Sequence, residues 1–385
     1  FADAARARDL PRFLDADTAA EHPALAKLVY AAVLLARPAP PQPIGAPLSP
    51  MTGADGRALR QSSVALGVLH VLLLAAVSPL AGALLAVHSY AVKYTAQIYL
   101  EALPMLLATV CVLTYQRGRF SAKGQRREEA HAKNAESAKD AKPRNPGLAS
   151  WREVLFLLLS AVALGLTAAG KYIYAVAGLA VAGDWLWTAA EARRPRWALG
   201  LLGWGAVALL AFLAANPTLW PDPVGRLLAS LGFHVAYAGG AHVAASGYPP
   251  WQPFVWLLTP QPALWHPGVI LVPLDPLIAV LGLLGATAMW RSGLPSADDG
   301  PRTTAGGMAV DERHPPRAPR HPPPFFILHP SSFLLPGRVI VLWWLLGLAF
   351  TLLWPTKWPQ YSLVMTAPMC LCAAEGVTGR MRDEG

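Results

Sequence analysis

The sequence predicts an all-α polytopic membrane protein. Of its 385 residues, 54% are hydrophobic and only 14% are charged, whereas a typical soluble domain has about 25% charged residues. The apolar residues gather in runs that approach the roughly 20 residues that a bilayer-spanning helix needs. Basic residues alternate between sparse and dense in the gaps between these runs. An ordinary soluble protein and a disordered chain are therefore excluded.

Nine apolar segments reach or approach spanning length. In order, they cover residues 62–77, 80–92, 98–115, 154–169, 172–188, 197–215, 268–290, 339–354 and 361–377. The second segment is short, and Pro79 between the first two indicates either a tight turn or a kink. Whether the chain crosses the membrane an odd or an even number of times depends on whether Pro79 marks a turn or a kink.

Basic residues predict the orientation, because cytoplasmic loops are enriched in Lys and Arg. Alternate gaps and the C-terminal tail together hold 21 of the 32 basic residues, ten of them within 116–152. The other gaps hold one each, namely Lys93, Lys171, Arg226 and Lys357. This split predicts nine crossings with the first 60 residues outside and the C-terminus inside. The net charge of +9 is thus explained by topology, and nucleic acid is not an expected partner.

The resulting organisation alternates membrane segments with loops. It comprises a first outer loop (1–61), membrane helices (62–115), a basic cytoplasmic loop (116–153), membrane helices (154–215), an outer loop (216–267), a membrane helix (268–290), a Pro-rich cytoplasmic loop (291–338), membrane helices (339–377) and a cytoplasmic tail (378–385). The compositions of both cytoplasmic loops are typical of disorder.

Metal chemistry has little support in the sequence. The three cysteines, Cys111, Cys370 and Cys372, lie in apolar runs and predict neither a disulfide framework nor a metal site. A His-Pro run within the Pro-rich loop is a poor candidate for a metal-binding site, because its prolines hold the chain extended. No cofactor is predicted, although a divalent metal stays open.

Lysines beside aromatic residues recur at three predicted outer junctions, at Lys93, Lys171 and Lys357. One interpretation is that they are snorkelling lysines and interfacial aromatics, which are common at helix ends. The other is a cationic vestibule for an anionic lipid headgroup, a phosphate or a pyrophosphate. Glu101, expected one turn inside its helix, needs a buried partner, for which Lys93 and Lys171 are the candidates.

Three further features of the membrane and outer segments lead to structural expectations. Asp275 is expected to cap a helix start, and Asp184 to lie at the inner interface. In the outer loop 216–267, apolar residues at helical spacing predict an amphipathic surface helix. His234 and His242 on that helix are eight residues apart and are expected to share a face. A metal site there is not favoured, since no acidic or Cys ligand lies nearby.

The first outer loop begins with an acidic lead that includes Asp9, Asp15 and Asp17, followed by an amphipathic helix entered through a proline. Glu21 and His22 precede this helix, either as its cap or as part of a site.

Several stretches, in order, resemble the bacterial members of glycosyltransferase family 39. The stretches are EHPALAKLVYAAVLL, KYTAQIYLEALPMLLATVCVLTY, SAVALGLTAAGKYIYAVAGLAV, NPTLWPDPVGRL and LLWPTKWPQYSLVMTAPMCLCAA. The resemblance implies a GT-C-type transmembrane helix bundle in the bacterial plasma membrane, with its active site on the outer side. It also implies inverting transfer of a sugar from a polyprenyl-phosphate carrier to a lipid, glycan or protein acceptor.

The resemblance carries over to particular positions. Glu21 and His22 match an acidic or His-Pro-Pro-Leu segment, in which Ala24 replaces the second proline. Glu101 matches an acidic residue early in a helix, and Lys357 with Tyr361 matches a Lys-x-x-x-Tyr pattern that faces the carrier phosphate. The family's catalytic acidic pair follows its first membrane helix, and no Asp-Glu pair occurs before Ser62. The catalytic Asp is therefore unassigned and is expected upstream of Phe1, in a part that this chain lacks.

The expected mechanism uses Lys93, Lys171 and Lys357 to stabilise the charge that develops on the phosphate leaving group. A carboxylate would deprotonate the acceptor hydroxyl as a general base, and apolar grooves would hold the prenyl tail. Two alternatives stay open: a transporter or flippase of an anionic polyprenyl lipid, and an inactive fragment. A transporter is expected to show an internal repeat, and none is evident in the sequence.

Overall fold

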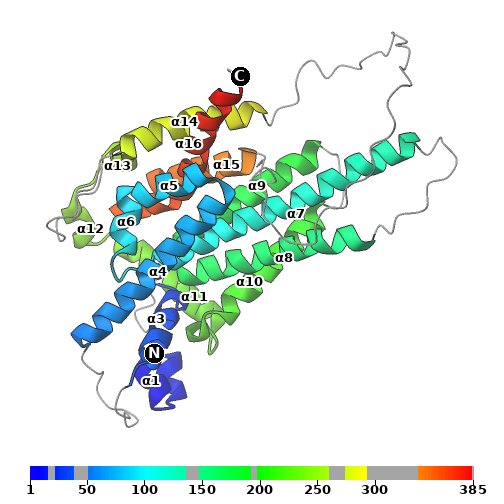
Figure 1. Cartoon of the computed structure of the whole chain (residues 1–385). Helices are drawn as coiled ribbons and strands as arrows, with labels where there is room; N and C mark the ends of the chain where they lie inside the picture. The colour runs from blue at the N-terminus through cyan, green and yellow to red at the C-terminus, as the bar shows by residue number, and fades with distance from the viewer. Residues whose placement is uncertain are drawn as a thin grey trace, which may run out of the picture.

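The computed structural model describes residues 1–15, 22–38, 51–135, 147–191, 197–259, 274–292 and 337–383. Throughout these ranges every regular element is a helix (Figure 1), as the composition predicted. The α-helices are α1 (Ala2–Arg6), α2 (Leu10–Leu14), α3 (Leu25–Leu35), α4 (Gly53–Val77), α5 (Pro79–Val87), α6 (Ser89–Thr95), α7 (Ala102–Ala135), α8 (Gly147–Gly170), α9 (Val176–Glu191), α10 (Trp197–Ala214), α11 (Pro223–Ala238), α12 (Ala241–Ser246), α13 (Gln252–Leu258), α14 (Asp275–Ser292), α15 (Gly337–Leu353) and α16 (Leu363–Asp383). Short 3-10 turns form η1 (Tyr172–Ala175), η2 (Pro217–Leu219) and η4 (Pro359–Ser362).

Three helices of the described chain are long and apolar enough to cross a membrane: Gly53–Val77, Trp151–Gly170 and Tyr172–Ala190. Shorter apolar helices cover Leu25–Leu35, Ala198–Ala214 and Gly337–Leu353. The helical architecture is thus confirmed, together with three candidate spans. The nine-crossing topology and its orientation stay predictions.

The second predicted segment, 80–92, does not form one helix. The Ser78 hydroxyl caps α5 by accepting from the Ala81 N–H at 3.3 Å, and Pro79 occupies the first position of α5. Extended backbone at His88 then separates α5 from α6. Pro79 therefore marks a break between two helices, and α5, with nine residues, is too short to span a bilayer alone.

Helices also extend beyond the predicted membrane segments. Thr52 and Asp55 form a capping box, so α4 begins nine residues before the predicted start at Ser62. The helix α7 continues past Tyr115 to Ala135, and α8 begins at Gly147. Much of the predicted loop 116–153 is therefore helical, because its Ala, Glu, Lys, Arg and Gln residues are strong helix formers. The remainder of that loop and nearly all of the Pro-rich loop lie outside the described residues.

Neighbouring helices pack in pairs across the bundle. α7 lies along α8, α8 along α10, α9 against α15, and α14 against α16 (Figure 1). The α14–α16 crossing depends on glycine, because a Cβ at Gly285 would overlap the carbonyl oxygen of Cys372. Small residues allow helix backbones this close approach. One end of the bundle gathers α1, α2, α3, η1 and η2, and a pocket opens there.

Candidate functional site

The pocket, of about 250 Å³, lies between the N-terminal helices and the segment that follows α10. Its lining is a mixture of charged, polar, aromatic and aliphatic side chains. These are Asp15, His22, Pro23, Tyr172, Asn216, Thr218, Leu219, Arg226, Ala229 and Ser230. Residues far apart in the sequence thus form one concave surface, and His22 is the one predicted site residue that lines it.

Asn216 fixes the floor of the pocket. Its side-chain oxygen accepts a hydrogen bond from the Ala24 N–H at 2.7 Å, and its side-chain nitrogen donates to the Phe212 carbonyl at 2.7 Å. Asn216 is 1% exposed, so both bonds are shielded from water. The amide therefore joins the start of α3 to the end of α10 and places His22 and Pro23 at the pocket.

Arg226, one turn inside α11, holds the opposite wall. Its guanidinium donates to the Thr218 carbonyl at 2.7 Å and to the Leu14 carbonyl at 3.0 Å. It also pairs with the Asp15 carboxylate at 2.6 Å. Because the Asp15 side chain is 54% exposed, this ion pair contributes no more than about 1 kcal/mol. The ion pair instead positions the N-terminal segment, since it brings Asp15 of the acidic lead to the pocket.

An aromatic cluster lies beside the pocket, with His234 of α11 at its centre. The His234 ring lies 6.2 Å from His22, 5.9 Å from Tyr172 and 6.4 Å from Trp354, measured between ring centroids. The Tyr172 hydroxyl lies 3.2 Å from the Ser230 hydroxyl. Elements from three parts of the chain therefore meet at His234.

The prediction that His234 and His242 share a helix face is wrong. The predicted amphipathic helix is present as α11, but it ends at Ala238, and Gly239 and Gly240 separate it from α12. Glycine lowers the stability of a continuing helix. His242 therefore lies on α12, where its ring packs 5.4 Å from Trp358.

A buried ion pair lies next to the pocket along the chain. Glu101 is 0% exposed and pairs with the ammonium of Lys171, one of its two predicted partners. The Tyr174 hydroxyl donates to the second Glu101 oxygen at 2.9 Å, and the Lys171 ammonium lies 5.5 Å from the Tyr361 ring centroid. Lys171 directly precedes Tyr172, so η1 joins this cluster to the pocket lining.

Glu101 itself lies directly before α7 rather than one turn inside it. The backbone carbonyl of Glu101 accepts from the Met105 N–H at 3.1 Å, which forms the first turn, and Pro104 lies within that turn. Proline is favoured at the first turn of a helix because no N–H is needed there. The carboxylate is thus oriented by its side-chain partners and by the helix start.

The two other predicted lysines lie on elements that meet at η4. Lys357 is 6% exposed, and its ammonium donates to the carbonyls of Thr351 and Leu352 at 2.9 Å each and to that of Trp354. The Lys357 ammonium therefore satisfies backbone carbonyl groups at the end of α15. Lys93 is half-buried on α6, which packs against η4, and lies 5.3 Å from the Tyr94 ring centroid. Burial lowers the pKa of Lys93 and that of Lys357 from their ordinary value.

Asp275 caps a helix, although not its own. Its carboxylate accepts from the backbone N–H and from the hydroxyl of Ser89, at 3.0 Å each. Its oxygen also lies 3.1 Å from the His88 ring nitrogen. Asp275 is 1% exposed, so it fixes the start of α6 to the start of α14. Sequence spacing does not reveal this contact, because 186 residues separate the partners.

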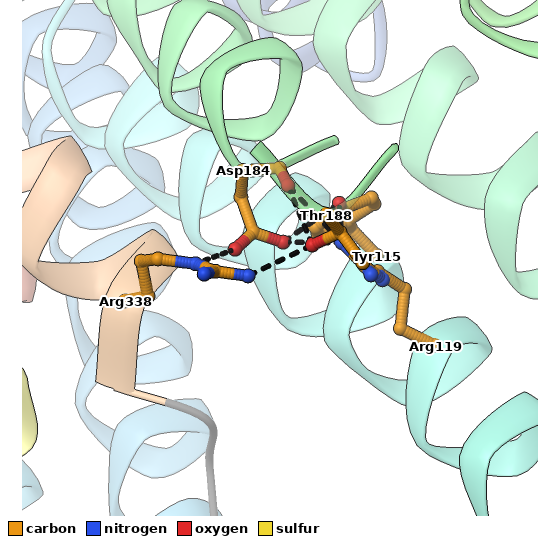
Figure 2. A network of polar contacts seen from close by, with 5 residues as sticks. All are labelled: Tyr115, Arg119, Asp184, Thr188 and Arg338. Atoms are coloured by element: carbon orange, nitrogen blue, oxygen red, sulfur yellow. Dashed lines mark hydrogen bonds and ion pairs between the residues drawn. The ribbon is translucent and has the colours of Figure 1, made fainter. Parts of the chain in front are cut away.

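Asp184 is buried between helices, and Figure 2 shows its polar contacts. Its predicted place at the inner interface of the membrane stays a prediction. Its two oxygens pair with Arg338 at 2.8 Å and with Arg119 at 2.6 Å. The Tyr115 hydroxyl donates to the same carboxylate at 2.9 Å, and the Thr188 hydroxyl accepts from Arg338 at 2.8 Å. Two guanidiniums neutralise the acid, so α7, α9 and α15 are joined here. None of these five residues lines the pocket.

No family model, curated protein or solved structure matches this chain. The predicted Glu21 lies outside the described residues. Among the described residues, no group of three His, Cys, Asp or Glu side chains is arranged to hold a metal ion.

Proposed function

We propose that this chain is a membrane glycosyltransferase that moves a sugar from a polyprenyl-phosphate carrier to an acceptor hydroxyl. One observation carries the proposal: a pocket with charged, polar and apolar lining adjoins the buried Glu101–Lys171 pair through the consecutive residues Lys171 and Tyr172. A polyprenyl-phosphate sugar presents hydroxyls and an anion on neighbouring atoms. The two adjoining regions have the chemistry that these two groups need.

The pocket takes the sugar in this proposal. Asp15, Asn216 and Arg226 present planar polar groups to it, and Tyr172 and His22 add rings. Carboxylate, amide and guanidinium groups hydrogen-bond hydroxyls in fixed directions, while rings pack on the apolar faces of a sugar. A volume of about 250 Å³ admits a single sugar unit rather than a chain, because ligand pockets for larger molecules run from about 300 to 1,000 Å³.

The three lysines predicted at the outer junctions take the phosphate in this proposal. The Lys171 ammonium pairs with the Glu101 carboxylate, and the Lys357 ammonium binds carbonyls at the end of α15. Lys93 is half-buried, and desolvation penalises its ammonium, so an anion placed beside it offsets that penalty. We assign the direct phosphate contact to Lys93 and Tyr361, with Lys171 and Lys357 supporting through charge. These cations stabilise the charge that develops on the phosphate as the sugar leaves.

The acceptor hydroxyl loses its proton to a carboxylate acting as general base, and attack on the face opposite the phosphate inverts the anomeric centre. Asp15 is the carboxylate of the pocket lining, whereas the family resemblance assigns the base to a preceding segment. Replacing Asp15 with Asn distinguishes between these two assignments of the general base. Retained transfer excludes Asp15 as the base.

The test measures binding of a radiolabelled undecaprenyl-phosphate hexose to the full chain in lipid nanodiscs. Saturable binding is expected, with affinity reduced several-fold in Lys93→Met and in Tyr172→Phe. Arg57→Met and Tyr248→Phe are matched controls, since both residues are exposed and neither lines the pocket. If the chain unfolds cooperatively yet binds nothing, or binds equally in all variants, the proposal fails.

A further inference from the structure

Helix α11 presents an uninterrupted apolar stripe on its outward face. Val224, Leu228, Leu231 and Val235 are 69%, 62%, 47% and 77% exposed. Their spacing of three and four residues places them on one face of the helix. Gly225 and Gly232 are exposed beside them, and the Asp222 carboxylate caps the helix next to Gly225, at the start of the stripe.

The inward face of the same helix has the opposite character. Arg226 and Ser230 line the pocket, and His234 packs against Tyr172 and Trp354. A helix on a water-exposed surface turns its apolar side chains inward and its polar ones outward. In α11 the arrangement is reversed, which indicates that water is not the solvent on its outer side.

Helix α13 carries a second exposed apolar surface. Phe254, Val255 and Leu258 of α13 are 46%, 39% and 55% exposed. Trp220 and Trp251, which precede α11 and α13, are 57% and 62% exposed. Tryptophans are enriched where hydrocarbon meets lipid headgroups. A monomeric soluble protein rarely exposes a contiguous apolar patch of this kind.

We propose that the outward face of α11 lies in the headgroup–hydrocarbon boundary of the bilayer, with lipid as its partner. The residues Trp151–Gly170 form a candidate membrane span. Leu227 of α11 packs against a cluster that includes Ala169 of this span and Phe212 of α10. This packing places α11 at the end of a candidate membrane span, which favours lipid over a second copy of the chain, whose interface would carry a polar rim.

The consequence concerns the pocket. The same helix faces lipid on one side and the pocket on the other, so the bilayer supports one pocket wall. A lipid-anchored ligand can then reach Arg226 and Ser230 while its tail stays in the leaflet. The inference rests on exposure and helix packing, and it stands whether or not the ligand is a sugar donor.

The experiment places a nitroxide on single introduced cysteines in the full chain, reconstituted in liposomes of phosphatidylcholine and phosphatidylglycerol. The positions are Val224→Cys, Leu228→Cys, Leu231→Cys and Val235→Cys. The three native cysteines are buried, and the unsubstituted chain measures any labelling of them. Arg57→Cys, exposed in the charged first turns of α4, is the aqueous reference. Collision rates with oxygen, which partitions into lipid, are compared with those of a water-soluble nickel chelate.

All four stripe positions are expected to collide readily with oxygen and poorly with the nickel chelate, and Arg57→Cys is expected to show the reverse. Nickel access at the stripe equal to that at Arg57→Cys would overturn the proposal. Dipolar broadening that disappears on dilution with unlabelled chain would overturn it as well, since it would assign the stripe to a second copy. Unchanged spectra on dilution, together with oxygen access, support lipid as the occupant.

Discussion

Two buried carboxylates, Glu101 and Asp184, lie in separate parts of the molecule and are neutralised in different ways. Each accepts a tyrosine hydroxyl at 2.9 Å, from Tyr174 and Tyr115 respectively. Glu101 is fully buried and pairs with one ammonium, whereas Asp184 is 7% exposed and pairs with two guanidiniums. The Asp184 network therefore keeps a net positive charge, while the Glu101 pair is neutral.

The two carboxylates therefore differ in position: Asp184 joins helices, and Glu101 lies beside the pocket lining. The partners of Asp184 come from three helices and lie away from the pocket lining, so its network joins helices. The partner of Glu101 is directly followed by Tyr172, which lines the pocket. Similar chemistry thus stabilises the bundle in one place and orients a site element in the other. Substitutions that act on only one of the two carboxylates test this comparison.

The largest effect is expected for Lys171→Met, because it leaves the Glu101 carboxylate buried without its cation. Removing one partner of a buried pair costs about 3–5 kcal/mol. Chemical unfolding in detergent measures the loss. The double variant Glu101→Gln, Lys171→Met is expected to recover most of it, since no charge then stays buried. A double variant as unstable as Lys171→Met alone would contradict a paired role.

Asp184→Asn is expected to cost about 2 kcal/mol, less than the loss of Lys171, because water reduces the penalty on the exposed parts of its partners. The side chains of Arg119 and Arg338 are 23% and 14% exposed. Asp55→Asn is the matched control, since Asp55 pairs with Arg37 at 2.9 Å in a more exposed setting. Its cost is expected to be smaller than that of Asp184→Asn. Equal losses in the two variants would remove the distinction between them.

Tyr174 and Tyr115 provide a matched pair of variants for testing ligand binding. Tyr174→Phe and Tyr115→Phe each remove a hydrogen bond to a carboxylate, and each is expected to cost about 1.5–3 kcal/mol. Only Tyr174→Phe is expected to weaken binding of the polyprenyl-phosphate hexose, since only Tyr174 contacts the cluster beside the pocket. Weaker binding in Tyr115→Phe would show that both networks act on the site through overall stability.

The sequence predicts the helical class and much of the local character of the site, but not its geometry. Hydrophobic runs and the Lys171 partner of Glu101 could be predicted, because burial of a carboxylate demands a cation. The contact of Asp275 with Ser89 and the double pairing of Asp184 could not, since both join residues distant in sequence. Asn216 and Arg226 were missed as pocket residues. Their signal was the NPTLWPDPVGRL stretch, whose polar side chains follow an apolar helix directly.

Helix breaks explain the other differences. Ser78 with Pro79, and extended backbone at His88, divide one predicted segment into α5 and α6. Glycines 239 and 240 divide the predicted amphipathic helix and place His242 on α12. Hydrophobic periodicity continues through such positions, so a pattern alone does not show where the backbone turns.

The smallest expected effect is a pH dependence of ligand binding through Lys93. Burial lowers the pKa of Lys93 in the unliganded chain, and a bound phosphate favours the ammonium, so its pKa is higher in the complex. Affinity is then fully present below the unliganded pKa and is lost as pH rises toward the pKa of the complex. From about pH 7 to about pH 10, a decline of less than about tenfold is expected.

The Lys93→Arg variant keeps the positive charge but removes its titration, because a guanidinium stays protonated throughout this pH range. It is expected to keep the binding while losing the decline, and Lys93→Met is expected to bind weakly at every pH. If the decline persists in Lys93→Arg, another group titrates, and the phosphate contact belongs to a different side chain. The Glu101–Lys171 pair is then the next to examine, because the proposed phosphate contact Tyr361 lies against Lys171.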